Sequence, residues 1–334
     1  MPNRMRWDGR TKQFYEVWYF IVQRPEERDA FWIRYTLLNP QDEHPAAGAG
    51  LWFGYASRLH PESSLALNQN FPQSELRAKP GEFDLTIAGA HLSEGKLRGG
   101  FSAGGHTVAW DLAYERQEDV DYFFGGLLRR LMERKTSVTI PNPRARFQGR
   151  VTIDGRGYPI AGAPGHEAHH WGREKAVSWR WAHCAAFSGA SGALLEALSA
   201  DKPPLPSMTF LRVATGEETV DLTSLPHALL GRAEAKLGSW RFSGGDPLRK
   251  VEIEISSPPG SLIRFLYHSP RYELSHCYNS PVADARVKLY RRSIPFGAWR
   301  LAGELRAEGT ANAEVVVPVD GDPFAAEFEA AQRS

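Results

Sequence analysis

Short runs of β-branched and aromatic residues, separated by turn-forming residues, recur along most of this sequence and constrain its fold more than any other feature. The first two runs are FYEVWYFIVQ at 14–23 and AFWIRYTLLN at 30–39, with a charged, proline-containing turn between them. Similar runs follow at intervals marked by Gly, Pro, Ser or Asn. Runs of this length and composition are typical of antiparallel strands in barrels and sandwiches. The sequence therefore predicts an all-β protein.

The runs fall into two series, which indicates two domains. Between them lies DYFFGGLLRRLMER at 121–134, where we expect a short linker helix although Gly125 and Gly126 weaken its first half. Two prolines follow this segment, so we expect an N-terminal domain at 1–138 and a C-terminal domain at 139–334. Because each half carries about nine runs, an internal duplication is also expected.

Two further segments have helical features. DPFAAEFEAAQ at 322–332 predicts a short C-terminal helix, with Asp322 as its N-cap and Pro323 at its first position. SLPHALLGRAEAKL at 224–237 is compatible with a helix or with a strand.

Charge and composition exclude several classes of protein. The 40 Lys and Arg residues balance 39 Asp and Glu residues, so no global charge points to nucleic acid. No run of 18 apolar residues and no secretory signal is visible, and two cysteines, Cys184 and Cys277, fit a reducing compartment. We therefore expect a cytoplasmic protein without a transmembrane segment, while a peripheral membrane contact stays open.

The segment HEAHHWG at 166–172 has the letters of the H-E-x-x-H zinc-protease signature. That signature places two histidines on one helical face with a glutamate beside the metal-bound water. Here Pro164 and Gly165 precede the segment, the flanking residues are typical of a loop and a strand, and no third ligand is evident. A zinc hydrolase is therefore the least favoured alternative, and we expect neither a metal nor a cofactor.

Several blocks, taken in order, resemble the tocopherol cyclases and their relatives. FYEVWYF is similar to the F-E-G-W-Y-[FY] opening of that group, and HTVAWDLAYE at 106–115 is similar to its S-W-D block. VTIDGRGYPIAGAPGHEAHHWG, followed by SWRWAHCAAF, resembles the second-domain block, which carotenoid 1,2-hydratases and AttH-like proteins write as G-Y-H-D-H-N-W-G. The resemblance spans about residues 12–310.

This resemblance implies two lipocalin-like antiparallel β-barrels in tandem. It also implies an apolar substrate and no redox cofactor, as in prenyl-quinone cyclases, carotenoid hydratases and, more distantly, natural-product Diels–Alderases. The sequence departs from the hydratases at Ala168, which stands where they place an aspartate, the expected proton donor. Because alanine cannot donate a proton, carotenoid hydration itself is not expected.

Acid-initiated addition or cyclisation of an alkene needs a proton donor in a dry cavity and aromatic faces that stabilise positive charge. The glutamate and histidine candidates named below have a structural alternative, hydrogen bonding to neighbouring loops. The tryptophan candidates have another, packing in the core. The candidate catalytic residues are Glu16, Glu167 and His169. The candidate substrate-binding residues are Trp18, Tyr19, His166, His170, Trp171, Trp179 and Trp181.

Two functional hypotheses lead. The first is a cofactor-independent enzyme that hydrates, cyclises or promotes a pericyclic step on an isoprenoid or polyketide-like molecule. The second is a non-catalytic carrier of hydrophobic small molecules, which the loss of the aspartate at Ala168 favours. In both cases the sequence leaves open whether the ligand lies inside one barrel or at the junction of the two.

Overall fold

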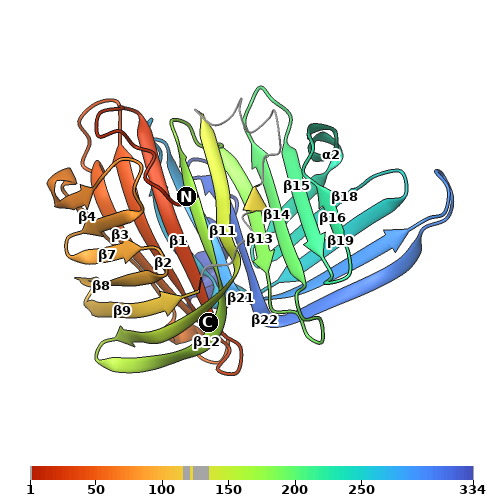
Figure 1. Cartoon of the computed structure of the whole chain (residues 1–334), viewed down its shortest axis with the longest axis horizontal. Coiled ribbons are helices and arrows are strands. Elements are labelled where there is room, and N and C mark those ends of the chain that lie inside the picture. Colours follow the sequence, from red (N-terminus) through yellow and green to blue (C-terminus); the bar gives the residue numbers. More distant parts are fainter. Residues whose placement is uncertain (1, 116–120, 123–134, 334) are drawn as a thin grey trace.

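Two large, curled antiparallel sheets packed side by side make up the computed structural model, which describes residues 2–115, 121–122 and 135–333 (Figure 1). The predicted all-β fold class is confirmed. Within these described residues, no helix has both the length and the apolar character needed to cross a membrane.

The first sheet contains twelve strands in the described part of the chain. Its principal order is β4-β3-β2-β1-β12-β11-β9-β8-β7-β6-β5, and β10 pairs with β11 outside this order. The strands are β1 (Phe14–Arg24), β2 (Asp29–Asn39), β3 (Gly48–Ser57), β4 (Leu65–Phe71), β5 (Leu76–Ala78), β6 (Asp84–Ile87), β7 (Ala90–Ser93), β8 (Lys96–Ala103), β9 (His106–Tyr114), β10 (Asp121–Tyr122), β11 (Thr136–Ile153) and β12 (Arg156–Gly172).

The second sheet has ten strands among the described residues. Its principal order is β16-β15-β14-β13-β22-β21-β19-β18-β17, and β20 pairs with β21. The strands are β13 (Ser178–Cys184), β14 (Leu194–Asp201), β15 (Met208–Ala214), β16 (Thr219–Leu222), β17 (Arg232–Lys236), β18 (Ser239–Gly245), β19 (Arg249–Ser256), β20 (Ile263–His268), β21 (Leu274–Arg291) and β22 (Arg300–Pro318).

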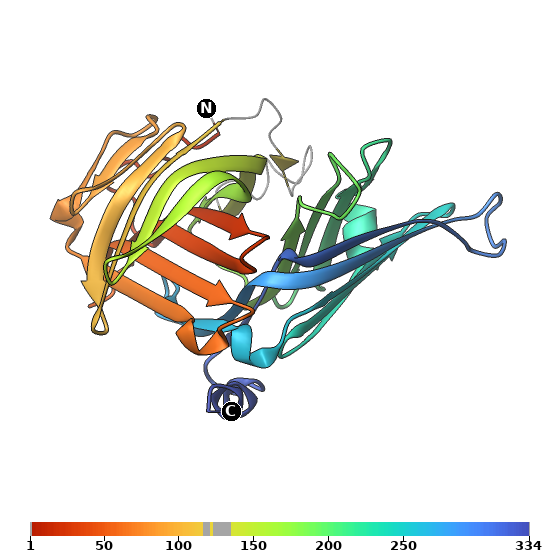
Figure 2. The same ribbon diagram turned by 90° about the horizontal axis from the view of Figure 1, so that it is seen from below.

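Strands β1, β2 and β3 are buried on both faces, which explains why their sequences are aromatic-rich rather than strictly alternating. Along β1, Trp18 and Phe20 face the core of the first sheet, whereas Ile21 belongs to a separate cluster that joins the two sheets. Trp32 on β2 and Phe265 on β20 stack in that joining cluster, with ring centroids 4.7 Å apart. Figure 2 shows the two sheets beside each other, with the C-terminal helix outside them.

A long bent hairpin, β11–β12, completes the first sheet. The register of β11 against β12 shifts on either side of Asn142, where Pro141 and Pro143 lack the amide protons that a regular ladder needs. The change from the first sheet to the second therefore falls between Gly172 and Ser178, while the expected boundary at 138–139 lies inside β11. The division into two separately folding domains stays a prediction.

The helices agree with the sequence in part. The C-terminal helix α3 (Ala325–Ala331) is present, but its N-cap is Phe324 rather than Asp322, whose carboxylate instead accepts the Phe324 amide proton. The ambiguous segment 224–237 contains both predicted structures, helix α2 (Leu225–Leu230) followed by β17. Of the expected linker helix, residues 121–122 form β10 and 123–134 lie outside the described residues.

Candidate functional site

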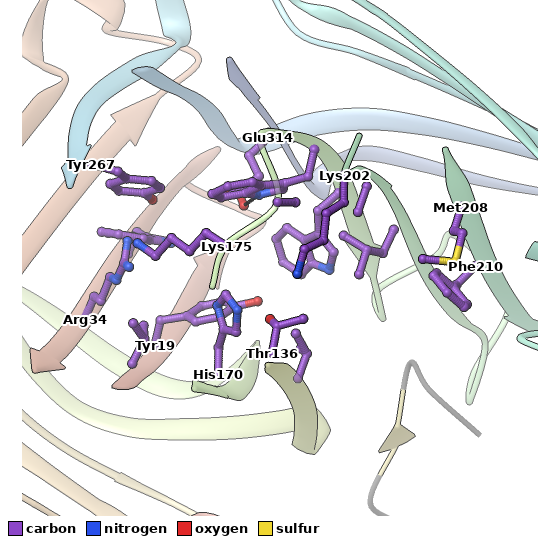
Figure 3. A pocket seen from close by; sticks show the side chains of 18 residues that line it. Tyr19, Arg34, Thr136, His170, Lys175, Lys202, Met208, Phe210, Tyr267 and Glu314 are labelled. Carbon is purple, nitrogen blue, oxygen red and sulfur yellow. Dashed lines mark hydrogen bonds between the residues drawn. The ribbon is translucent and has the colours of Figure 1, made fainter. Parts of the chain in front are cut away.

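A pocket lies between the two sheets, with walls from both. β1, β2, β11 and β12 contribute from the first sheet, and β13, β14, β15, β20 and β22 contribute from the second. Figure 3 shows these side chains converging from opposite ribbons. The pocket is lined by Val17, Tyr19, Trp32, Arg34, Thr136, Val138, His170, Lys175, Ala176, Trp179, Trp181, Leu198, Ala200, Lys202, Met208, Phe210, Tyr267 and Glu314.

Aromatic side chains form most of the apolar wall. The rings of Trp179 and Tyr267 stack with centroids 6.3 Å apart, and Tyr19 meets Trp181 edge-on at 5.9 Å. The cavity measures about 110 Å³, and a neighbouring cavity of about 390 Å³ shares Lys175 and Tyr267 with it. Because a cavity of about 150 Å³ accommodates benzene, the inner pocket fits a compact part of a ligand whose remainder extends past Lys175.

Arg34 is the most unusual group in this wall. It lies on β2 with only 6% of its surface exposed, and its guanidinium carbon is 4.4 Å from the ring centroid of Tyr267 and 5.4 Å from that of Trp52. In the described part of the chain, no carboxylate lies within 4.0 Å of it, and its Nε has no hydrogen-bond partner. A buried cation is costly unless an anion accompanies it. The Arg34 guanidinium is therefore suited to bind an anionic group of a ligand.

Lys175 is the second basic residue at this end of the pocket, where Figure 3 places it beside Arg34 and Tyr267. It lies in the loop between β12 and β13, and its Nζ donates a hydrogen bond of 3.2 Å to the carbonyl oxygen of His268. Burial, together with the positive charge of Arg34, lowers the pKa of the Lys175 amine to about 7, while Glu314 acts in the opposite sense. Lys175 therefore exchanges a proton near neutral pH.

The other charged groups of the pocket already have partners. Lys202 Nζ is 2.5 Å from a carboxylate oxygen of Glu174. Glu314 accepts hydrogen bonds from the Trp179 indole at 2.6 Å and from the Cys277 thiol at 3.4 Å. This leaves Arg34 and Lys175 as the groups with unused capacity for an anionic or electron-rich oxygen.

His170 lines the pocket and pairs with Tyr15, which lies just outside the pocket wall and whose ring centroid is 4.9 Å from the Lys175 Nζ. The Tyr15 hydroxyl is 2.6 Å from His170 Nε2 and 3.0 Å from the Thr136 hydroxyl oxygen. Burial raises the pKa of Tyr15 and lowers the pKa of His170 well below its ordinary value. The phenol therefore stays protonated and the imidazole neutral, and the two groups share a hydrogen bond.

Four of the predicted binding residues line the pocket, namely Tyr19, His170, Trp179 and Trp181. Trp18 does not, because it lies one position from Tyr19 on β1 and its side chain points to the other face of the strand. Trp171 is also outside the pocket wall, with the guanidinium carbon of Arg6 4.5 Å from its ring centroid.

Glu16 of β1 and His169 of β12, two of the predicted catalytic residues, form a buried pair on the face of the first sheet opposite the pocket. His169 Nε2 is 2.8 Å from Glu16 Oε1, and the imidazole stacks on Trp18 with ring centroids 4.9 Å apart. The Glu16 carboxylate also accepts the backbone amide protons of Arg6 at 2.7 Å and Trp7 at 2.9 Å. These contacts fasten the N-terminal segment to the first sheet, and neither Glu16 nor His169 contributes to the pocket wall.

Glu167, the third predicted catalytic residue, also faces away from the pocket. It accepts hydrogen bonds from the Asn3 amide at 2.6 Å and from the Tyr114 hydroxyl. The catalytic assignment of Glu16, Glu167 and His169 stays a prediction, and their positions give each of them a role in packing.

The HEAHHWG segment forms the end of strand β12, not a helix. Alternate residues of a strand face opposite sides, so His166 and His170 face the second sheet while Glu167 and His169 face the first. The geometry of the zinc-protease signature is therefore absent from this segment. His166 instead meets His183 and Glu196 of the second sheet, and one ligand atom from each of the three lies within 4.8 Å of the others.

Sequence reasoning missed Arg34, Lys175, Tyr267 and Glu314. A signal for Arg34 was present, because it is the only charged residue within the aromatic run at 30–39. No comparable signal marks Lys175, since it lies in an ordinary polar loop and becomes buried only when the two sheets pack together.

No family model matches the sequence, and no curated protein matches it either. Two solved structures share its fold over nearly the whole chain. A protein of Nitrosomonas europaea, provisionally assigned as an AttH, is 13% identical with a TM-score of 0.53, and the alignment covers 90% of this chain and 92% of that one. CghA is 11% identical with a TM-score of 0.55, and the alignment covers 95% of this chain and 93% of that one. At these identities the likeness shows a common fold of two curled sheets and nothing further.

Proposed function

We propose that the pocket between the sheets binds an apolar small molecule with an anionic or electron-rich oxygen, and that the protein is a cofactor-independent enzyme promoting a cyclisation or pericyclic step on it. The observation that carries the proposal is the placement of Arg34 and Lys175 at one end of an otherwise aromatic pocket. Ligand pockets of this kind are mainly apolar and use a few polar groups to fix orientation. An isoprenoid or polyketide-like body fits the wall, and a carboxylate or enolate fits the two cations.

Groups suited to catalysis face the same space. The Tyr15–His170 pair, of which His170 lines the pocket, and the neighbouring Lys175 amine provide a proton relay and a base. Arg34 stabilises negative charge that develops on an oxygen during bond formation, which is the kind of fixed electrostatic help that accelerates such steps. A shaped aromatic wall adds the positioning that a pericyclic or cyclisation step requires.

A non-catalytic carrier is the second candidate. Glu16 and Glu167, the carboxylates predicted as proton donors, contact protein groups outside the pocket. A carrier would need the apolar wall and the two cations but not the Tyr15–His170 pair. Tyr15→Phe therefore separates the two functions, since it preserves binding in both and lowers turnover of a host metabolite only in an enzyme.

The binding proposal is tested with 2-naphthoate and its neutral isostere 2-naphthamide, titrated by calorimetry at pH 6.5. We expect 2-naphthoate to bind at least about tenfold more tightly, since one net hydrogen bond to a charged group contributes about 1.5–3 kcal/mol. As a control, Lys202→Met removes another lysine of the pocket. Because that lysine already pairs with Glu174, the difference in affinity between the two probes should persist in this variant. Equal affinities for the two probes would contradict the proposed anion recognition.

The affinity for the anionic probe is expected to fall as the pH rises through about 7, the pKa of Lys175. Below this pH the amine is protonated and the pocket presents two cations, whereas above it only Arg34 stays charged. His170 and His268 both have lowered pKa values and stay neutral across this window. The Kd of 2-naphthoate should rise about tenfold between pH 6 and pH 8.5, and Lys175→Met should make it independent of pH.

A further inference from the structure

A polar layer lies buried between the two sheets, apart from the pocket wall. Antiparallel pairing places His183 of β13 directly opposite Glu196 of β14 on one side and Asn312 of β22 on the other. Residues opposite each other in neighbouring strands project to the same face of a sheet. The three side chains therefore form a row on one face of the second sheet, and each is at least 98% buried.

His166 of the first sheet meets this row. Its Nε2 lies 3.2 Å from Glu196 Oε1, and its ring centroid lies 4.3 Å from that of His183. His166 is fully buried, and within the described residues neither of its ring nitrogens has a hydrogen-bond partner. The same holds for both amide atoms of Asn312. Buried polar atoms usually have partners, so these four atoms are candidates for binding a ligand.

We propose that this layer binds one divalent transition-metal ion, held by His166, His183 and Glu196. Two ligand atoms at 2.0–2.1 Å from a tetrahedral ion lie about 3.3 Å apart. The separation of 3.2 Å between His166 Nε2 and Glu196 Oε1 matches this value, and one ring nitrogen of His183 lies within 4.8 Å of the ligand atoms of the other two residues. The Asn312 carboxamide, in the same row, is available as a further oxygen ligand.

The protonation states suit a metal. Burial lowers the pKa of His166 to about 3 and that of His183 to about 4, so both imidazoles are neutral and keep a lone pair at physiological pH. His183 Nε2 contacts the Pro143 carbonyl oxygen at 2.9 Å, which leaves Nδ1, a buried atom with no hydrogen-bond partner among the described residues, as the nitrogen that would bind the ion. Metal-bound histidines commonly donate their other ring proton to a carbonyl in this way.

The positive charge of Arg144, which also acts on His183, opposes a cation, while the Glu196 carboxylate acts in the favourable sense. Two imidazoles and a carboxylate suit Zn²⁺ or Fe²⁺ better than Mg²⁺ or Ca²⁺, which prefer oxygen ligands. Because the ligands come from β12 on one sheet and from β13 and β14 on the other, the ion would fasten the two sheets together. The proposal is independent of the ligand pocket.

The test is a titration of the full chain with Zn²⁺ by calorimetry, after EDTA treatment and dialysis. We expect one ion per chain with a Kd below about 1 µM, and a rise in Tm of about 4 °C at a free-ion concentration near 100 times Kd. Glu196→Gln, which preserves the side-chain volume, should weaken binding by at least about 100-fold. His276→Asn is the matched control, since His276 is 2.6 Å from the Asp322 carboxylate at a separate place.

If Glu196→Gln fails to fold, His166→Asn takes its place, and circular dichroism of each variant without metal checks the fold. Co²⁺ gives a second readout, because visible absorption bands of a nitrogen- and oxygen-ligated ion should appear in the wild-type chain and vanish in the variant. Absence of Zn²⁺ binding tighter than about 100 µM, or binding that survives Glu196→Gln and His166→Asn unchanged, would overturn the proposal.

Discussion

Glu16→Ala is expected to lower the free energy of unfolding by about 3–5 kcal/mol, because it removes one carboxylate that satisfies several buried donors at once. The carboxylate accepts two backbone amides of the N-terminal segment and contacts His169 Nε2. Without it, the Arg6 and Trp7 amides and the buried imidazole lose their acceptor. The N-terminal segment would then detach from the first sheet more readily, and Trp18, which donates its indole proton to the Asn3 carbonyl, would lose that contact.

Chemical denaturation followed by tryptophan fluorescence measures this effect, with Glu62→Ala as the control because Glu62 is an exposed residue of a short 3-10 turn. Glu16→Gln should cost less than Glu16→Ala, since its amide oxygen still accepts one backbone proton. An unchanged unfolding midpoint in Glu16→Ala, together with lost turnover of a host metabolite, would contradict the packing role and restore Glu16 as a catalytic acid.

Arg34→Met is expected to weaken binding of 2-naphthoate by about 100-fold and to leave binding of 2-naphthamide nearly unchanged. The fold-change corresponds to the loss of a bidentate, charge-assisted contact inside a pocket that excludes water. Methionine fills much of the space of the arginine stem, so the contacts with Trp52 and Tyr267 persist in part. Folding should not suffer, because the substitution removes a buried cation that has no carboxylate within 4.0 Å in the described chain.

Two further variants, Arg34→Lys and Arg98→Met, are compared with Arg34→Met in the same binding experiment. Arg34→Lys keeps the charge but not the two-pronged geometry, so we expect an intermediate affinity. Arg98 is exposed on β8, far from the pocket wall, and its replacement should change neither probe. If Arg34→Met weakens both probes equally, the arginine shapes the pocket rather than recognising an anion.

The architecture was predictable from local features. Dense β-branched and aromatic runs with Gly, Pro and Asn between them favour strands wherever they occur, and the curled sheets follow from them. The N-cap of α3 was misplaced by two residues because Asp322 caps through the Phe324 amide before the helix begins. The location of the boundary was harder, since β11 and β12 extend the first sheet well past the proline pair.

The pocket was predictable only in part, because its walls come from strands far apart in sequence. Tyr19, His170, Trp179 and Trp181 could be chosen from their residue types and from the family resemblance. The choice between neighbours such as Trp18 and Tyr19 depends on which strand face meets the second sheet, and this is set by tertiary packing rather than by local pattern. Lys175 and Tyr267 meet only because the loop after β12 lies against β20.

The most direct test of the account is a crystal structure of the full chain with bound 2-naphthoate. We predict that the naphthalene ring lies between Trp179 and Tyr19 and that its carboxylate is within hydrogen-bond distance of Arg34 and Lys175. Density for the probe in another cavity, or in this pocket with its carboxylate directed away from both cations, would contradict the claim that this junction is an anion-recognising ligand site.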